Sequence, residues 1–383
     1  KLGEICEVFA DGDWVETKDQ SRSGVRLIQT GNIGRLFYIH KDGRARYISE
    51  QTFKRLDCTE VFPGDILISR LPDPVGRACI IPHLDTRMIT SVDCTIIRPK
   101  IKIVMREYLL YFTESPEYSS RVVMLLSGST RKRISKSNLA EIKIPLPPLE
   151  IQERIVKKIE GLFAKIDQAQ SLRESATRDI NSFIAASIHQ ALNKMPVWQE
   201  KRFGDIMEVV TKRTTKTDLP YIGMEDVSAG GTAEFYGSLQ PQSVKSMTFH
   251  FDYNHVLYGK LRPYLNKILV PQFEGHCTTE FLPLKPDGKL LTREWLALWL
   301  RSQETVNKIM TTTTGTRMPR ADMKRVRDFI IPLPPIAEQK KIVERMDALT
   351  QKVRQLQILQ SETATNLTAL KQSILHKAFQ GEL

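Results

Sequence analysis

The chain lacks the features that mark membrane proteins, exported proteins and disulfide-rich proteins. No apolar run approaches the roughly 18 residues that a membrane-spanning helix needs, and the residues from Lys1 onward show no charged and then apolar signal pattern. The five cysteines are odd in number and have no C-x-x-C or Cys/His ligand spacing. We therefore expect buried, reduced thiols rather than disulfides or zinc ligands, and a cytoplasmic location.

Motifs that carry catalysis are also missing. The sequence contains no G-x-x-x-x-G-K-[ST] phosphate loop and no G-x-G-x-x-G after a strand pattern, so it indicates neither ATP-driven translocation nor a dinucleotide fold. The Asn/Asp-Pro-Pro-aromatic tetrapeptide of amino-methyltransferases is absent as well. The seven histidines have no metal-ligand spacing. We expect a chain without a catalytic site, a metal or a cofactor of its own.

Positive charge is what the composition does supply. The 383 residues include 56 Lys and Arg against 44 Asp and Glu, a formal net charge of +12. A surplus of this size favours a polyanionic partner, either nucleic acid or an acidic membrane surface. The length is sufficient for two or three domains with separate cores.

An internal repeat organises the chain. The motif I-P-L-P-P starts at Ile144 and again at Ile331, 187 residues later, and the same offset persists through the tracts that follow both copies. The region before each motif has a short-strand pattern, as at residues 65–70. A helical pattern at residues 106–126 contains Pro116, which we expect to break it. The sequence therefore predicts an α+β protein with two similar mixed domains and an internal pseudo-two-fold repeat.

The tract after each motif has a heptad pattern, which is typical of a long helix paired with another long helix. Each helix would span about 43 residues, roughly 65 Å, with Pro196 ending the first and Gly381 capping the second. We predict domains at residues 1–148 and 196–335 and antiparallel coiled-coil helices at 149–195 and 336–383. The predicted seam residues are Ile155, Ile159, Leu162, Ile166, Ile180, Phe183, Ile342, Met346, Leu349, Val353, Leu367 and Leu370.

The duplicated motif followed by a heptad helix resembles the specificity (S) subunit of Type I restriction-modification systems. The strand pattern ending L-I-S-R, with Val75-Gly76-Arg77 beyond it, and the ending that starts at Ser373 support the resemblance, which covers essentially the whole chain. It implies that each domain recognises one half of a bipartite site in double-stranded DNA. It also implies that the helices set the gap between the half-sites.

The resemblance further implies which molecules work with the chain. Methyltransferase (M) subunits, expected to be two, would dock on the repeated regions, and restriction (R) subunits would join them in the full complex. S-adenosylmethionine, and ATP with magnesium, are expected on those partners rather than on this chain. The S subunit itself is not an enzyme. The resemblance also implies a cytoplasmic location in a bacterium or archaeon and no membrane partner.

Candidate DNA contacts lie in basic loops beside the predicted strands. In both copies a glycine precedes an arginine by five residues, and that arginine precedes the I-P-L-P-P motif by eleven. Lysine and arginine can neutralise phosphates, threonine can bond to them, and arginine can contact guanine bidentately. The predicted DNA-binding residues are Arg70, Arg77, Thr130, Arg131, Lys132, Arg133, Lys136, Lys260, Arg262, Lys267, Thr316, Arg317, Arg320 and Lys324.

Other interpretations remain open at this point. The basic clusters are compatible with solvated loop faces that bind nothing. The same architecture suits a methylase-only complex or a Type II-like assembly with a separate specificity subunit. A coiled-coil scaffold that binds proteins, with incidental positive charge, is the alternative from another class, and it predicts weak, salt-insensitive association with DNA. Trp295, Trp299, Tyr108 and Phe112 fit helix faces packed in a core better than base-stacking platforms.

Overall fold

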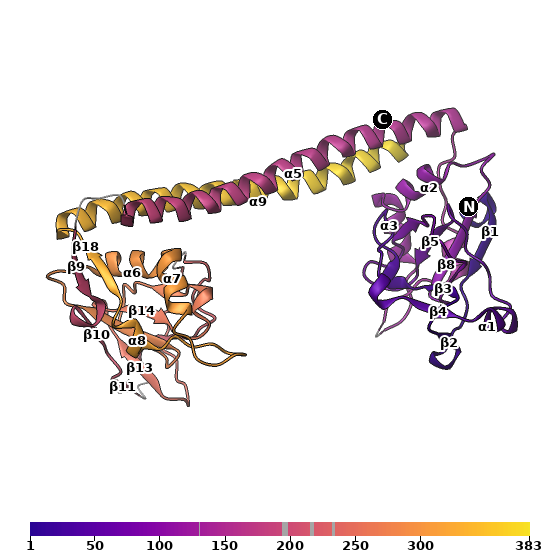
Figure 1. Cartoon of the computed structure of the whole chain (residues 1–383). Helices are drawn as coiled ribbons and strands as arrows, with labels where there is room; N and C mark the ends of the chain where they lie inside the picture. Colours follow the sequence, from indigo (N-terminus) through magenta and orange to yellow (C-terminus); the bar gives the residue numbers. More distant parts are fainter. Residues whose placement is uncertain (130, 194–197, 215–217, 232–233) are drawn as a thin grey trace. The chain divides into compact units, whose positions relative to one another are not determined.

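A computed structural model describes residues 1–129, 131–193, 198–214, 218–231 and 234–383 (Figure 1). The chain divides into two compact units. Unit 1 comprises Lys1–Leu172 together with Glu362–Leu383, and unit 2 comprises Arg173–Ser361. The end of the chain thus returns to the unit that contains its beginning.

Unit 1 contains two four-stranded sheets. The first is antiparallel, with strand order β1-β8-β5-β6, and the second, in order β2-β4-β3-β7, has a parallel pair, β3 and β7. Ile66 and Ile68 of β5 belong to the core that also contains the helices, whereas Leu67 belongs to the core on the other side. This burial on both faces explains why β5 is a continuous apolar run. The strands are β1 (Cys6–Asp11), β2 (Gln20–Ser21), β3 (Val25–Ile28), β4 (Arg46–Ile48), β5 (Ile66–Ser69), β6 (Ala78–Ile80), β7 (Met88–Thr90) and β8 (Cys94–Pro99).

The helices of unit 1 confirm the predicted break at Pro116. The side chain of Ser115 caps the helix that follows by accepting a hydrogen bond from the Tyr118 amide at 3.2 Å, and Pro116 occupies its first turn. Tyr108 and Phe112 are buried against Phe379, which confirms their predicted core role. The helices are α1 (Glu50–Arg55), α2 (Arg106–Phe112), α3 (Pro116–Met124) and α4 (Lys136–Ala140), with 3₁₀ turns η1 (Gly3–Ile5), η2 (Thr17–Asp19), η3 (Thr30–Asn32) and η4 (Asp42–Arg44).

Unit 2 repeats the first sheet and rearranges the second. Its first sheet has the order β10-β17-β14-β15, which matches β1-β8-β5-β6 strand for strand. Its second sheet has the order β11-β13-β16-β12, in which β13 pairs with β16. The counterpart of β13 in unit 1, by order along the chain, is β4, and β4 pairs with β3 instead. A separate pair joins β9 and β18. The strands are β9 (Gln199–Arg202), β10 (Met207–Val209), β11 (Arg213–Thr214), β12 (Tyr221–Ile222), β13 (Thr248–Phe251), β14 (Val256–Gly259), β15 (Ile268–Leu269), β16 (Gly275–Thr278), β17 (Phe281–Pro286) and β18 (Ile330–Leu333).

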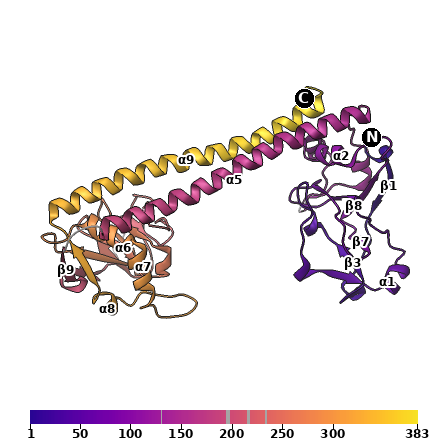
Figure 2. The same ribbon diagram turned by 45° about the horizontal axis from the view of Figure 1, so that its top comes forward.

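The helices of unit 2 follow the pattern of unit 1. They are α6 (Arg293–Arg301), α7 (Gln303–Met310) and α8 (Met323–Val326), with 3₁₀ turns η5 (Phe203–Asp205) and η6 (Pro263–Leu265). Figure 2 shows α6 and α7 between α9 (Ile336–Gln380) and the strands. Trp295 and Trp299 of α6 are buried in the core, as predicted. All five cysteines of the chain are buried, as predicted, and free.

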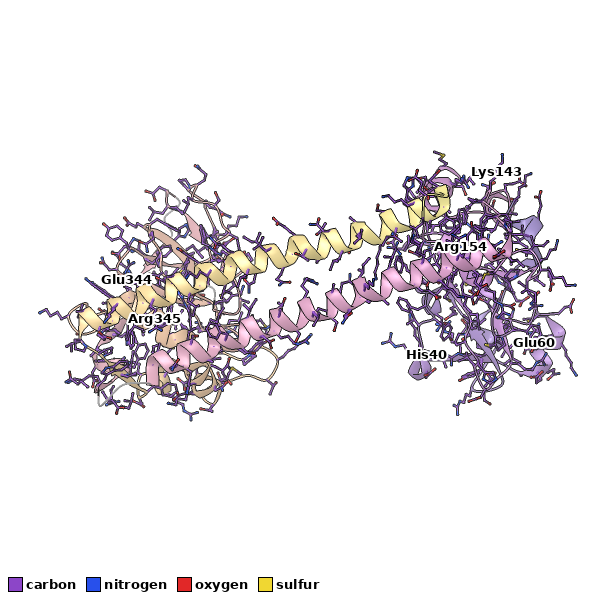
Figure 3. All side chains as sticks on the ribbon, turned by 90° about the horizontal axis from the view of Figure 1, so that it is seen from above. His40, Glu60, Lys143, Arg154, Glu344 and Arg345 are labelled. Carbon is purple, nitrogen blue, oxygen red and sulfur yellow. The ribbon has the colours of Figure 1, made fainter. Side chains whose placement is uncertain are left out.

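Two long helices, α5 (Leu149–Asn193) and α9, each contain 45 residues. Within unit 1, Lys371 of α9 forms an ion pair with Asp167 of α5, and within unit 2 the Arg173 Nη1 donates to the Gln360 carbonyl at 3.1 Å. The pairing is antiparallel, because residue numbers rise along α5 as they fall along α9. Figure 3 shows the exposed charged side chains Arg154 on α5 and Glu344 and Arg345 on α9.

The predicted cap of the second long helix is confirmed, because α9 ends at Gln380 and Gly381 adopts φ 81°. The predicted stop of the first helix at Pro196 lies outside the described residues.

A duplicated glutamine anchors each long helix to its own unit. Gln152, which is fully buried, accepts a hydrogen bond from the Met105 amide at 2.9 Å and donates to the carbonyls of Ile103 and Pro147. Gln339, 187 residues later and also fully buried, makes the same three bonds to the Thr292 amide and to the carbonyls of Leu290 and Pro334. The start of each helix is therefore fixed by side chain to backbone bonds that the repeat preserves.

Candidate nucleic-acid interface

Two matched loops carry basic side chains. In unit 1 the backbones of Ser127 and Arg133 exchange two hydrogen bonds of 2.9 Å, and in unit 2 those of Thr314 and Arg320 exchange two of 3.0 Å. The glycine after the first residue has a positive φ in both loops, 96° at Gly128 and 85° at position 315. The repeat has therefore kept the frame of both loops at an offset of 187 residues.

In the loop of unit 1, the cationic side chains are accessible. Arg131 and Lys132 are exposed, and Lys136 is exposed at the start of α4. The Arg133 guanidinium lies 4.0 Å from the Asp93 carboxylate and is about half exposed. Thr130 lies outside the described residues. This loop thus presents four cations with only one close carboxylate among the residues that the structure describes.

In the loop of unit 2, one cation is held by an internal ion pair. Arg320 donates from Nη2 and Nε to the Glu280 carboxylate at 2.8 and 3.1 Å, and this contact raises the pKa of the arginine. Thr316 and Arg317 are exposed, as is Lys324 on α8. The two loops therefore share a frame and offer different side chains.

Arg70 and Arg77, both predicted DNA contacts, lie inside unit 1. Arg70 is 4% exposed, forms an ion pair with Asp11 at 3.3 Å and donates to the Val92 carbonyl. Arg77 is 9% exposed, and burial lowers the pKa of its guanidinium. Its nitrogens donate at 2.8–2.9 Å to the carbonyls of Thr30, Ile33, Leu71 and Pro74. In the structure these guanidinium groups hold loops in place, which is a supporting role.

The cations predicted after β14 lie on a loop attached to the basic loop of unit 2. The amide of Arg262 donates to the Pro319 carbonyl at 2.7 Å. Arg262 and Asn266 both adopt φ 50°, a left-handed conformation that non-glycine residues rarely adopt and that is concentrated at functional sites. Arg262 is exposed, whereas Lys260 and Lys267 are half-buried, and Lys267 donates to the Met224 carbonyl at 2.5 Å.

A cleft of about 440 Å³ borders the basic loop of unit 1. Arg131 and Lys132 line it together with Arg35, Asp73 and Ser119. Arg35 forms an ion pair with the largely buried Glu114 at 2.7 Å. The cleft thus combines cations with the carboxylates of Asp73 and Glu114 and the hydroxyl of Ser119, groups that can contact both phosphates and base edges.

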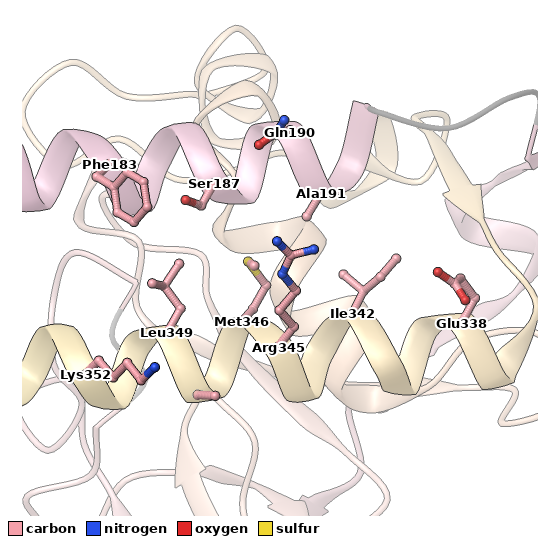
Figure 4. A pocket seen from close by; sticks show the side chains of 11 residues that line it. Phe183, Ser187, Gln190, Ala191, Glu338, Ile342, Arg345, Met346, Leu349 and Lys352 are labelled. Carbon is pink, nitrogen blue, oxygen red and sulfur yellow. The ribbon is translucent and has the colours of Figure 1, made fainter.

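The predicted seam residues differ in their burial. Ile155, Ile159, Ile166, Met346 and Val353 are buried, whereas Leu162, Ile180, Ile342, Leu349 and Leu367 are half-buried. Phe183 is 57% exposed and Leu370 is 47% exposed. Phe183 is exposed because it points from α5 into an open cleft of about 610 Å³ in unit 2, opposite Leu349 and Met346 of α9 (Figure 4).

Membrane spans and metal clusters are both absent from the described part of the chain. None of the helices described is long and apolar enough to cross a membrane. Across the described ranges, no group of three or more His, Cys, Asp or Glu side chains is placed to hold a metal ion.

Comparison with known proteins gives consistent matches. The family model of the Type I restriction modification DNA specificity domain matches residues 1–177 and 195–361. The EcoDI specificity subunit of Escherichia coli is 24% identical over 67% of this chain. The chain spans 66% of the length of that relative, just under two thirds. The EcoKI specificity subunit of E. coli K12 is 24% identical over 85% of this chain and 76% of its own length. The MjaIX specificity subunit of Methanocaldococcus jannaschii is 22% identical over 100% of this chain and 92% of its own length.

Solved structures show the same fold. A chain from a structure of the type I R-M system superposes with a TM-score of 0.79 at 21% identity and covers 100% of this chain and 97% of that one. The HsdS subunit from Thermoanaerobacter tengcongensis superposes with a TM-score of 0.58 at 21% identity and covers 100% of this chain and 96% of its own.

Proposed function

The chain belongs to the family of Type I restriction modification DNA specificity domains, and we propose that it is the subunit that recognises a bipartite DNA target, with one half-site for each unit. Its relatives are specificity subunits, which are DNA-recognition components and not catalytic themselves. The observation that carries the proposal is the pair of matched loops. Loops 127–133 and 314–320 have one backbone frame on a repeated sheet but different side chains, as two readers of different half-sites require.

The charges on these loops suit DNA. Arg131, Lys132 and Lys136 in unit 1, and Arg317 and Lys324 in unit 2, are exposed and would neutralise phosphates or contact bases. Arg133 and Arg320, half-exposed beside Asp93 and Glu280, would reach DNA by exchanging a carboxylate for an anionic or guanine oxygen. The buried Arg70 and Arg77 would support the loops that make contact.

Two separated readers need a fixed connection, because base edges recur on one face of the duplex every 34–36 Å or so. Both units share the helices α5 and α9, and Gln152 and Gln339 fix the start of each helix to its unit. Helices anchored in this way transmit orientation, whereas a Gly/Ser linker would not. We assign to them the spacing of the two half-sites.

The chemistry is assigned to partners. Methyltransferase subunits, two per chain, would supply S-adenosylmethionine, and restriction subunits would supply ATP with magnesium, in the cytoplasm of a bacterial or archaeal cell. The cleft of Figure 4 is a candidate docking site for a methyltransferase helix. It exposes Phe183 on the helical tract that the two copies share, where one kind of partner could bind twice, rather than on the loops in which the copies differ.

A map of modified bases tests this proposal. DNA is sequenced from cells that express this chain with its neighbouring methyltransferase gene, and from cells that lack only this chain. We expect a methylated motif of two short half-sites around a fixed unspecified gap, present only with this chain. If the methyltransferase modifies the same sites without it, or if the two proteins co-purify and no bipartite motif appears, the chain is a protein-binding scaffold instead.

A further inference from the structure

Unit 1 contains a second, smaller cleft that none of the predicted DNA contacts lines. It has a volume of about 240 Å³, and four cationic side chains line it: Arg26, Lys41, Arg44 and Arg46. Gln29 and Thr30 add polar groups, and none of its described lining residues carries a carboxylate. We call it the basic cleft. Figure 3 shows His40, the residue before Lys41, and Glu60 at opposite sides of unit 1.

Arg26 is the least exposed of the four cations. It lies on β3 and is 6% exposed. One guanidinium nitrogen donates to the Tyr47 hydroxyl at 3.1 Å, and another lies 3.7 Å from the carboxylate of Asp42, which is 81% exposed. Its Nε has no hydrogen-bond partner among the described residues. A buried cation with an unused donor and a solvated counter-ion is costly unless an anion binds beside it.

The other three cations stand at the mouth of the cleft. All three are exposed: Lys41 precedes the turn η4, Arg44 ends that turn, and Arg46 begins the strand β4. A Cβ on Gly31 would lie 2.8 Å from the Lys41 ammonium, so the missing side chain lets Lys41 approach η3 closely. The arrangement therefore concentrates donors of positive charge around one small space.

The basic cleft adjoins the candidate interface through Arg77. That side chain donates to the carbonyl of Thr30, which lines the basic cleft, and to the carbonyl of Ile33. Arg77 also lines the larger cleft together with Arg131 and Lys132. The segment of residues 30–33 thus contributes to the basic cleft and holds Arg77, which lines the larger cleft.

We propose that the basic cleft binds a phosphate group of the DNA backbone beside the half-site of unit 1, an inference that rests on the proposed function. Lysine and arginine donors suit a phosphate diester, because no described lining residue carries a carboxylate and the Asp42 carboxylate near Arg26 is 81% exposed. The volume is below the roughly 300–1,000 Å³ of sites for drug-sized ligands. A phosphate contact fixes the position of the duplex and carries no sequence information. The cleft sets register, and the loops read the bases.

The test uses the full chain assembled with its methyltransferase partner. Binding is measured against salt for a duplex that contains the target and for an unrelated duplex of equal length. In Arg44→Ala/Arg46→Ala, affinity for both duplexes should fall by the same factor. The slope of log K against log salt should become shallower by about 0.9 for each phosphate that the variant no longer neutralises. The methylated motif should not change. Lys54→Ala, which removes an exposed cation from α1 outside the cleft, should leave the slope as it is.

Gly31→Ala is a second variant that removes no charge. Gly31 does not have a positive φ, so alanine fits its backbone and mainly displaces the Lys41 ammonium. We expect a smaller fall in affinity for both duplexes.

Three results would overturn the proposal. Unchanged affinity and slope in Arg44→Ala/Arg46→Ala would show that no phosphate binds there, and a changed motif would make the cleft a reader of bases. Binding of inorganic phosphate that the double variant abolishes, with unchanged DNA binding, would assign the cleft to a free anion. Failure of the proposed function looks different, because then the wild-type complex itself shows no bipartite motif.

Discussion

The duplicated glutamine anchor makes the most quantitative prediction. Gln152→Ala removes three hydrogen bonds from a fully buried site and leaves the Met105 amide and two carbonyls without partners. A hydrogen bond contributes about 1 kcal/mol net, and each buried group left unpaired costs about 1–3 kcal/mol. With three groups left unpaired, the lower end of this range gives an expected decrease of about 3 kcal/mol in the local stability of the α5 anchor.

Hydrogen exchange of single amides measures this decrease where it occurs. In Gln152→Ala the Met105 amide should exchange roughly 100-fold faster, since 1.4 kcal/mol corresponds to a factor of ten, while the Thr292 amide of unit 2 should keep its protection. Gln339→Ala should do the reverse. The control is Gln168→Ala, which truncates an exposed glutamine of the same helix. If each variant accelerated hydrogen exchange at both amides equally, or at neither amide, the two glutamines would not be local anchors that each act on their own unit.

Three further predictions concern single groups. Burial raises the pKa of Asp13 to about 6, so its neutral form stabilises the fold below about pH 4 and this contribution is lost as the pH rises through 6. Asp13→Asn should therefore remove this pH dependence and raise the unfolding free energy at pH 7 by about 1–2 kcal/mol, after allowance for partial exposure, in denaturant titrations. Arg133→Ala and Arg320→Ala should each damage recognition of one half-site or weaken DNA binding while co-purification with the methyltransferase persists; unchanged target recognition would remove them from the interface. Arg173→Leu should raise the melting temperature, because the buried Arg173 Nε has no hydrogen-bond partner among the described residues and leucine continues the apolar seam; a lower melting temperature would show that its bond to the Gln360 carbonyl is worth more.

The repeat and its helices could be predicted from local patterns. The long helices, the break at Pro116 and the cap at Gly381 each depend on neighbouring residues, and the structure has all three. The pairing of short strands could not be predicted. Strands of two to four residues carry little register information, so nothing local shows that β4 pairs with β3 whereas β13 pairs with β16.

The accessible cations of the candidate interface could be predicted from the sequence only where they are contiguous. Residues 131–133 stand out as a run, and they are accessible. Arg77 belongs to a predicted basic loop, but two of the four carbonyls that accept its hydrogen bonds, those of Thr30 and Ile33, lie more than 40 residues earlier in the chain. The cations of the basic cleft span residues 26–46 and meet only because β3 and β4 are paired. Phe183 fits the heptad, yet periodicity alone does not show which seam positions the partner helix covers.

A comparison of variants by modified-base mapping tests most directly the claim that each unit reads one half of the DNA target. Cells would carry the methyltransferase with the wild-type chain, with Arg131→Ala/Lys132→Ala in unit 1, or with Arg317→Ala in unit 2. We predict that the unit 1 variant relaxes the sequence of one half-site, that the unit 2 variant relaxes the other, and that the gap keeps its length in both. If both variants relaxed the same half-site, or if the two halves always changed together, the assignment of one reader to each unit would be wrong.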